Sequence, residues 1–316
     1  MSNRKIIMGV DTSNYTTSVA LTYSDGELIA NFKLPLPVKS GERGLRQSDA
    51  VFAHVKNLPR LMEAVRAELC GRTPAAIGVS ERPRNVEGSY MPCFLSGVAA
   101  AESISASLGI PIYRFSHQCG HVMAAVYSSG RSELLSSDFL AFHLSGGTTE
   151  LLRVRYDRLG FHSEIVGGTL DLNAGQIVDR IGVRMGLAFP AGAELEGLAL
   201  KCNEKIKAPR ASVKGGFVNL SGLENRAVKL LDEGNSPEYV SAFTLYSLLG
   251  AITAVCDAAL DGCGSMPIVF AGGVMSNSIL KRELAARYDA CFAEPRMSSD
   301  NAVGIAELTR RAHLNI

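Results

Sequence analysis

The chain has 316 residues, of which 47% are hydrophobic and 20% charged, a composition that excludes a disordered tail or a collagen-like fibre and suits a folded core. Its 32 Lys and Arg against 31 Asp and Glu leave a net charge of +1, so no global basic field attracts nucleic acid or membrane, and RNA contact requires a local patch. The length is about twice that of a usual domain, which predicts two domains.

Neither a membrane span nor a disulfide framework is expected from the sequence. No apolar run approaches the roughly 18 residues of a span, and the stretch 6–10 is too short for a signal-peptide core. Seven cysteines are spread along the chain without a CxxC pair. We therefore expect a soluble, reduced, cytoplasmic protein without a membrane partner.

Hydrophobic patterning and turn residues divide the chain into two similar halves. The first half predicts, in chain order, a strand at 6–10, a polar turn at 11–17, strands at 18–23 and 27–32, a helix at 48–70, a strand at 76–79, a helix at 93–108 and a strand at 110–113. The second half predicts strands at 139–144 and 149–156, helices at 174–185 and 237–260, a strand at 268–270, a helix at 278–288 and a closing helix at 301–312. Because each half has a hairpin followed by helices, we predict an α/β duplication with a cleft between the halves.

His117 and His121 give the strongest chemical signal, in the sequence His-Gln-Cys-Gly-His. If this segment is helical, the i, i+4 spacing puts both imidazoles on one face, where two nitrogens reach one divalent metal. The alternative is a pair of helical histidines that bind no metal. Position 118 is Gln, where the zinc-protease motif requires a glutamate. Cys119 is expected to be a packing residue, and His54 either a packing residue or a contact at a domain interface.

Three turns have the composition of phosphate-binding loops. Asp11-Thr12-Ser13 follows a buried strand, Ser145-Gly146-Gly147-Thr148 joins two strands, and Gly272-Gly273 ends a strand before a helix. Glycine lets backbone N–H groups approach phosphate oxygens, and hydroxyls add donors. Each turn alone is a weak signal, because tight turns need such residues without any ligand. Their order is similar to that in actin-like ATPases and sugar kinases.

Taken together, these segments make the chain resemble the TsaD-type tRNA threonylcarbamoyladenosine transferases, a branch of the actin-like superfamily. The resemblance runs from about Met8 to Ala306 and is carried by seven segments in the same order: 9–13, 117–121, 144–151, 174–179, 220–223, 271–277 and 299–302. It implies an α/β fold of two actin-like (ASKHA, ribonuclease H-like) domains with a nucleotide and metal cleft between them. The first domain is expected at 1–112, completed by the closing helix 300–316, and the second at 113–299.

The resemblance also implies which residues bind a metal ion and which bind the acyl-adenylate. One metal ion, iron or zinc, is expected on His117, His121 and Asp300. The residues expected to bind the acyl-adenylate are, for the phosphate, Thr12, Ser13, Leu144, Ser145, Gly146 and Gly147; for the ribose, Asp179 and Gly192; and for the adenosine, Gly272, Gly273 and Asn277. Asp300 and Asp179 have plain alternatives, as the N-cap of the closing helix and as a surface acid of a helix.

The first loop departs from the family pattern. Where the family reads ETSCDET, residues 11–17 read DTSNYTT, so Tyr15 and Thr16 replace two carboxylates. If one of those carboxylates removes a proton from the tRNA amine, this chain lacks that group, and Asp11 is the only acid of the loop left for a catalytic role. The alternative for Asp11 is an Asx-type turn. The family's GPG is also replaced, by residues 82–84.

The function that the resemblance implies is transfer of threonylcarbamoyl from threonylcarbamoyl-adenylate to the exocyclic amine of adenosine 37 in ANN-reading tRNA, assisted by the metal. It further implies local contact with tRNA, and it is compatible with TsaB-like and TsaE-like protein partners and with a dimer through the first domain. The alternative is a nucleotide-binding, non-catalytic paralogue that regulates a partner enzyme, which the loss of the loop acids favours. A metalloprotease is not favoured, because this chain lacks the glutamate that the protease motif requires. An actin-like kinase is not favoured either, because such kinases do not use the HxxGH motif.

Overall fold

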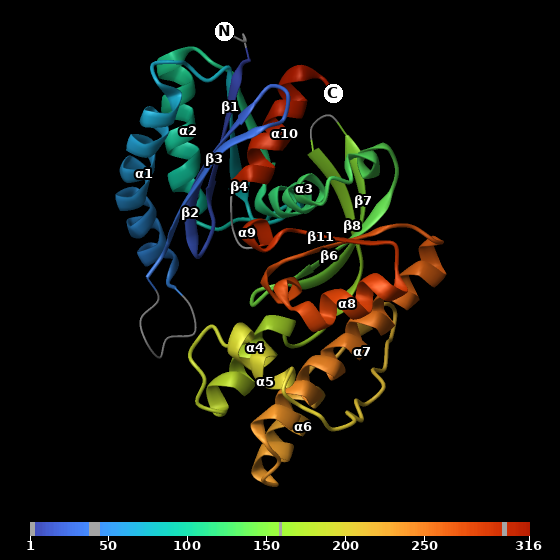
Figure 1. The fold of residues 1–316 in the computed structure, drawn as a ribbon. Coiled ribbons are helices and arrows are strands. Elements are labelled where there is room, and N and C mark those ends of the chain that lie inside the picture. The colour runs from blue at the N-terminus through green and yellow to red at the C-terminus, as the bar shows by residue number, and fades with distance from the viewer. Residues whose placement is uncertain (1–3, 38–44, 158–159, 299–301) are drawn as a thin grey trace. The chain divides into compact units, whose positions relative to one another are not determined.

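The structure is a computed structural model that describes residues 4–37, 45–157, 160–298 and 302–316 (Figure 1). These residues fall into two compact units. Unit 1 contains the described parts of 1–135, 156–162 and 299–316, and unit 2 contains 136–155 and 163–298. The domain boundary expected at residue 112 stays a prediction.

Unit 1 is built on a five-stranded sheet with the strand order β3-β2-β1-β4-β5. Its strands are β1 (Ile6–Thr12), β2 (Thr16–Tyr23), β3 (Leu28–Pro35), β4 (Ala76–Arg82) and β5 (Ile112–Ser116). Strand β1 is antiparallel to β2 and parallel to β4, so the predicted hairpin is confirmed. Strand β5 starts two residues later than predicted, because the Ile110 N–H bonds to Ser105 O in the cap of the preceding helix.

Helices cover both faces of the unit 1 sheet. On one face lie α1 (Gln47–Leu69) and α2 (Phe94–Leu108), and on the other lies α10 (Val303–Leu314), as Figure 1 shows. Helix α3 (His117–Ser129) packs against α10 and against β4 and β5. The predicted helices at 48–70, 93–108 and 301–312 are confirmed, with bounds shifted by up to two residues.

Unit 2 repeats this topology. Its six-stranded sheet has the order β11-β10-β6-β7-β8-β9, so β8-β7-β6-β10-β11 matches the order of the first sheet. The strands are β6 (Phe139–Leu144), β7 (Thr149–Asp157), β8 (Gly160–Thr169), β9 (Phe217–Val218), β10 (Ile268–Ala271) and β11 (Ala290–Phe292). Strand β6 is antiparallel to β7 and parallel to β10. The predicted α/β duplication is confirmed, whereas the cleft between the halves stays a prediction.

The core of unit 2 forms between its sheet and a layer of helices. The helices are α4 (Ala174–Arg184), α5 (Gly192–Ala199), α6 (Ser221–Asp232), α7 (Pro237–Cys263) and α8 (Ser278–Arg287), with short turns η1 (Ser132–Ser136, in the segment that joins the units), η2 (Gly273–Ser276) and α9 (Pro295–Ser298). Phe142 and Phe270 of the sheet and Phe243 of α7 are buried in this core. Helix α7 is the one described helix long and apolar enough to cross a membrane, but most of it is buried inside the unit, as in core helices of globular proteins.

Candidate functional site

The first group of candidate residues lies where β1 and β4 end, in unit 1. Val10 pairs with Val79 in parallel register, which places Asp11 next to Ser80. The Asp11 side chain is fully buried, and the Ser80 hydroxyl donates a hydrogen bond to its Oδ1 atom. Within the described part of the chain, Asp11 Oδ2 has no hydrogen-bond partner. A buried carboxylate costs free energy unless it is paired or hydrogen-bonded. The stability of the Asp11 carboxylate therefore depends on the other side chain that faces it.

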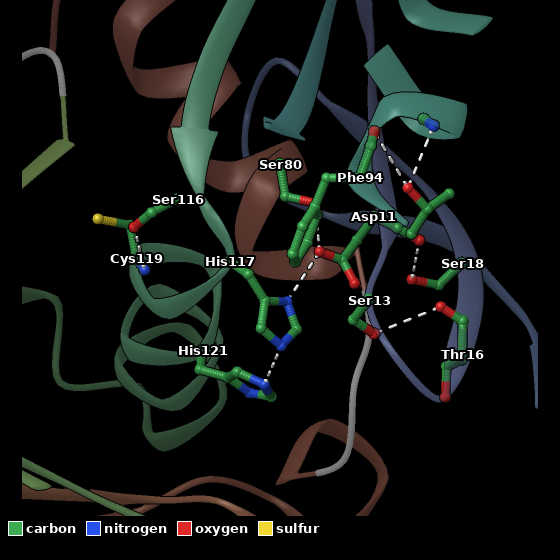
Figure 2. A network of polar contacts seen from close by, with 12 residues as sticks. Asp11, Ser13, Thr16, Ser18, Ser80, Phe94, Ser116, His117, Cys119 and His121 are labelled. Carbon is green, nitrogen blue, oxygen red and sulfur yellow. Dashed lines mark hydrogen bonds and ion pairs between the residues drawn. The ribbon is translucent and has the colours of Figure 1, made fainter. Parts of the chain in front are cut away.

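That neighbour is His117, the first residue of α3. Ser116 caps the helix by accepting a hydrogen bond from the Cys119 N–H at 3.2 Å. His117 Nδ1 lies 2.8 Å from Asp11 Oδ1, and His117 Nε2 lies 2.9 Å from His121 Nε2 (Figure 2). The helix that the i, i+4 spacing requires is therefore present, and it brings both imidazoles together.

The two Nε2 atoms are spaced as ligands of one divalent cation are. Two nitrogens about 2.1 Å from an ion lie about 3.0 Å apart at the right angle of octahedral coordination and about 3.4 Å apart at the tetrahedral angle usual for zinc. The 2.9 Å observed is close to the octahedral spacing, and it also suits a hydrogen bond between the rings. In Figure 2 Asp11 and His121 lie at opposite ends of the His117 ring, so Asp11 is not a third ligand of such an ion. No metal-binding group of three acidic, histidine or cysteine side chains occurs among the described residues. Asp300, the expected third ligand, lies outside them.

Close packing fixes α3 in this position. A methyl group on Gly304 of α10 would lie 1.9 Å from Gly120 O, so only glycine permits this approach of the two helix backbones. The Phe94 ring of α2 packs against His117 with ring centroids 5.8 Å apart. Cys119 is buried, as expected of a packing residue, and burial raises the pKa of its thiol.

Side chains of α1 form hydrogen bonds to the first loop. The sequence did not predict these contacts. His54 is fully buried; its Nδ1 accepts from Thr17 Oγ1 at 2.8 Å and its Nε2 donates to the Ser13 carbonyl at 2.9 Å. Burial lowers the pKa of His54. Gln47 donates to Asn14 Oδ1 at 2.7 Å. The signal for these contacts is their spacing of seven residues on α1, which puts Gln47 and His54 on one helix face.

The hydroxyl groups of the first loop are already engaged. Thr12 is fully buried; its hydroxyl donates to Cys93 O at 3.1 Å and accepts from the Gly97 N–H at 3.1 Å. Ser13 is 2% exposed, whereas Tyr15 is 45% exposed. The assignment of Thr12 and Ser13 to a phosphate stays a prediction.

The second group of candidate residues lies in unit 2, at the turn between β6 and β7. Ser145 Oγ accepts from the N–H groups of Gly147 at 3.2 Å and Thr148 at 3.0 Å. The start of α4 packs onto this turn: Gly175 N–H donates to Ser145 O at 3.1 Å, and a side chain on Gly175 would lie 2.6 Å from Gly146 N. Apart from the adjoining residues, no heavy atom of the described chain lies within 4 Å of a Cβ position at Gly146 or Gly147, so one side of the turn is open.

Backbone contacts bring the other unit 2 candidates together. Gly272 has a φ of +96°, and a Cβ there would lie 2.3 Å from Leu144 O, so glycine is required where this loop meets the start of the turn. Asp179 Oδ1 accepts from the Ala191 N–H at 2.9 Å, which ties Asp179 to the residue before Gly192. Burial raises the pKa of Asp179, and this hydrogen bond partly offsets the rise.

Asn277 is 8% exposed and caps α8, because its Oδ1 accepts from the Leu280 N–H at 3.0 Å. The Ser278 N–H next to it donates to Glu196 of α5 at 2.7 Å, a contact that the sequence analysis missed. The predicted residues thus form two groups, each assembled within its own unit. Whether the two groups share a ligand stays a prediction.

The fold and these two groups define an α/β protein of the actin-like class, and the predicted fold class is confirmed. The HypF structure from T. kodakarensis superposes with a TM-score of 0.64 at 12% identity, covering 99% of this chain and 48% of that one. This chain therefore spans about half of the HypF chain, and the likeness shows the fold alone.

A family model for tRNA N6-adenosine threonylcarbamoyltransferase (TsaD) matches residues 38–307. The transferase of that name from Streptococcus pneumoniae (strain CGSP14) is 31% identical, over 96% of this chain and 90% of that protein. The one from Bacillus subtilis (strain 168) is 28% identical, over 97% and 90%. The chain belongs to the TsaD family, which is a family of transferase enzymes.

Proposed function

We propose that this chain transfers the threonylcarbamoyl group of threonylcarbamoyl-adenylate to the exocyclic amine of adenosine 37 in ANN-reading tRNA. The observation that carries the proposal is the His117–His121 pair, with Nε2 atoms 2.9 Å apart at the start of α3, in a member of the TsaD family. In the reaction the amine nitrogen bonds to the carbamoyl carbon and loses a proton. The bond from that carbon to the phosphate oxygen breaks, and AMP leaves with the electron pair.

In this proposal the residues of unit 2 bind the adenylate. The open side of Gly146 and Gly147 lets a phosphate approach the backbone of the turn, where it would replace Ser145 Oγ as the acceptor of the Gly147 and Thr148 N–H groups. Asp179 uses one oxygen on the Ala191 N–H, and we assign its Oδ2 to a ribose hydroxyl. Asn277 uses Oδ1 as a helix cap, and we assign its Nδ2 to the adenine.

The histidine pair of unit 1 is proposed to bind one divalent metal, iron or zinc, with Asp300 as the third ligand. Such an ion, when bound, stabilises negative charge that develops on the leaving phosphate. Imidazole nitrogens and a carboxylate are a donor set that suits either metal, and the 2.9 Å between the two nitrogens is closer to the spacing of octahedral ligands than to that of tetrahedral ones. The tRNA, TsaB-like and TsaE-like proteins and a second copy of the chain are the proposed partners.

Modification of tRNA in vitro tests this function. Purified protein, loaded with iron or zinc, is mixed with threonylcarbamoyl-adenylate, unmodified ANN-reading tRNA and the proposed partner proteins. Mass spectrometry of the nucleosides should show threonylcarbamoyladenosine with this tRNA and none with a tRNA that carries guanosine at position 37. Equal modification of both tRNAs would contradict the proposed site of transfer.

One observation favours a second function, that of a non-catalytic nucleotide-binding regulator. Tyr15 is 45% exposed in the first loop, and it and Thr16 replace acids of the family pattern. Removal of a general base costs about 10²–10⁴ in rate, so the double variant Tyr15→Asp, Thr16→Glu should transfer faster than the native chain. If neither protein modifies tRNA while both bind nucleotide, the regulator is the correct function.

A further inference from the structure

The carboxylate of Asp11 lies behind the histidine pair, at the end away from His121. It is fully buried, and its Oδ1 receives the Ser80 hydroxyl and faces His117 Nδ1 at 2.8 Å. A carboxylate accepts hydrogen bonds and donates none. His117 Nδ1 therefore has the proton in this pair, and the lone pair of the neutral ring is on Nε2, which faces His121.

This position excludes two other roles for Asp11. Figure 2 shows Asp11 and His121 at opposite ends of the His117 ring, so Asp11 cannot bind the ion that both histidines share. A general base must come within about 2.6–3.2 Å of the proton it removes, or reach it through one water. Asp11 has no exposed surface, and the Phe94 ring packs against the same imidazole.

We infer that Asp11 is a positioning residue, which fixes the ring orientation and tautomer of His117 so that Nε2 is available to a metal, rather than the base suggested by its place in the first loop. The inference rests on the proposed function only in requiring that His117 binds a metal. Carboxylates that hold the second nitrogen of a metal-binding histidine typically contribute about 10–100-fold to metal affinity.

Ser80 restricts the carboxylate in turn. Its place opposite Asp11 follows from the parallel register of β1 and β4, and its hydroxyl donates to the same Oδ1 atom that faces His117. Asp11→Asn preserves size but offers an amide that either accepts from or donates to Nδ1. The preference for the Nδ1-protonated tautomer is then lost without removal of a side chain, so the variant should fold.

The first test is the tautomer of His117 in metal-free, ¹⁵N-histidine-labelled protein at pH 8, read from long-range ¹H–¹⁵N spectra and assigned with His117→Gln. Native protein should show the proton on Nδ1, and Asp11→Asn should show a shift toward Nε2. The second measurement is Zn²⁺ affinity by competition with a chelating dye. Asp11→Asn should bind Zn²⁺ about 10–100-fold more weakly, whereas the matched variant of the exposed Asp25, Asp25→Asn, should bind as the native chain does.

An Nε2-protonated His117 in the native protein, or unchanged Zn²⁺ affinity in folded Asp11→Asn, would overturn the inference. These readouts do not depend on tRNA modification. A protein that shows the expected tautomer change and affinity loss but never modifies tRNA supports the inference and contradicts the proposed function. A protein that modifies tRNA while Asp11→Asn binds Zn²⁺ normally contradicts the inference alone.

Discussion

The buried imidazole of His54 shows how one side chain of α1 sets the shape of the first loop. Its two nitrogens bond to Thr17 and to the Ser13 carbonyl, on either side of the exposed Tyr15. Thr17 also accepts from Asn57 of α1 at 3.1 Å. The neutral ring accepts from the Thr17 hydroxyl, whereas a protonated ring would donate to it. Protonation of His54 therefore places a charge in a fully buried position, which costs free energy.

We expect His54 to make the chain less stable as the pH falls. Burial lowers the pKa of folded His54 below its ordinary value of 6.5, so the unfolded chain binds the proton more readily and unfolding becomes easier as pH falls through about 6.5. His54→Gln retains a donor for Ser13 and does not titrate. The free energy of unfolding, measured with urea and circular dichroism, should fall more between pH 8 and pH 5.5 in the native chain than in this variant. The exposed His162→Gln is the control and should behave as native; equal pH dependence in all three proteins would remove His54 as the cause.

At the residue scale, the sequence predicts contacts between residues of the same helix but not contacts that depend on strand pairing. The i, i+4 spacing of His117 and His121 brings their rings together once a helix forms. Ser80, which lies 69 positions from its partner Asp11, depends on which strands pair and in what register. No motif encodes that pairing, so the hydrogen bond from Ser80 to Asp11 could not be predicted from spacing alone.

At the scale of elements, the crossing of α3 and α10 decides where the histidine pair lies. The helices touch through backbone, since Gly120 O lies where a Gly304 side chain would be. Gly120 belongs to the HxxGH motif itself, so this residue of the motif serves packing while the two histidines face the site. A displacement of α10 therefore moves His117 relative to Asp11.

Gly304→Ala should destabilise the chain by about 1–3 kcal/mol or more, because the added methyl group meets backbone that cannot rotate away. The matched control is Gly197→Ala in α5, where no described atom outside the adjoining residues and the local helix backbone lies within 4 Å of the new Cβ. That change should be neutral or stabilise by up to about 1 kcal/mol through helix propensity. Urea midpoints of both variants give the comparison, and equal midpoints would show that α3 and α10 are not packed this closely.

Elements were predicted well where a long apolar pattern exists. Helices α1 and α7, of 23 and 27 residues, were found within a few residues of their ends. Helix α5 has eight residues and buries only Leu195 and Ala199, and α6 buries only Leu223 and Ala227. Two to three turns with only two buried apolar residues do not separate a helix from a loop. Strand β8 was missed because its buried residues do not alternate.

At the scale of the whole molecule, the two groups of candidate residues occupy equivalent places in a duplicated fold. Asp11 lies at the end of β1, and the turn at 145–148 follows β6; each is the central strand of the five that the two sheets have in common. Ser80 lies at the end of β4, and Gly272 follows its counterpart β10. Ligands of open α/β sheets bind at the carboxyl ends of the strands, so we expect each unit to have a binding edge of its own, with acidic and imidazole groups in unit 1 and glycines in unit 2.

This division predicts that each ligand protects its own unit. ADP at 100 times its dissociation constant stabilises the state it binds by about 2.7 kcal/mol, so hydrogen exchange followed by mass spectrometry should slow around 144–148, 174–179 and 272–277. Zn²⁺ alone should instead slow exchange at the start of α3.

Asp179→Ala should weaken ADP binding roughly tenfold or more in calorimetry, because it removes hydrogen bonds to a charged group, which contribute about 1.5–3 kcal/mol. Asp261→Ala, at an exposed position of α7, should leave ADP binding unchanged. Protection by ADP confined to unit 1, or native affinity in Asp179→Ala, would show that the glycine-rich edge is not the nucleotide site.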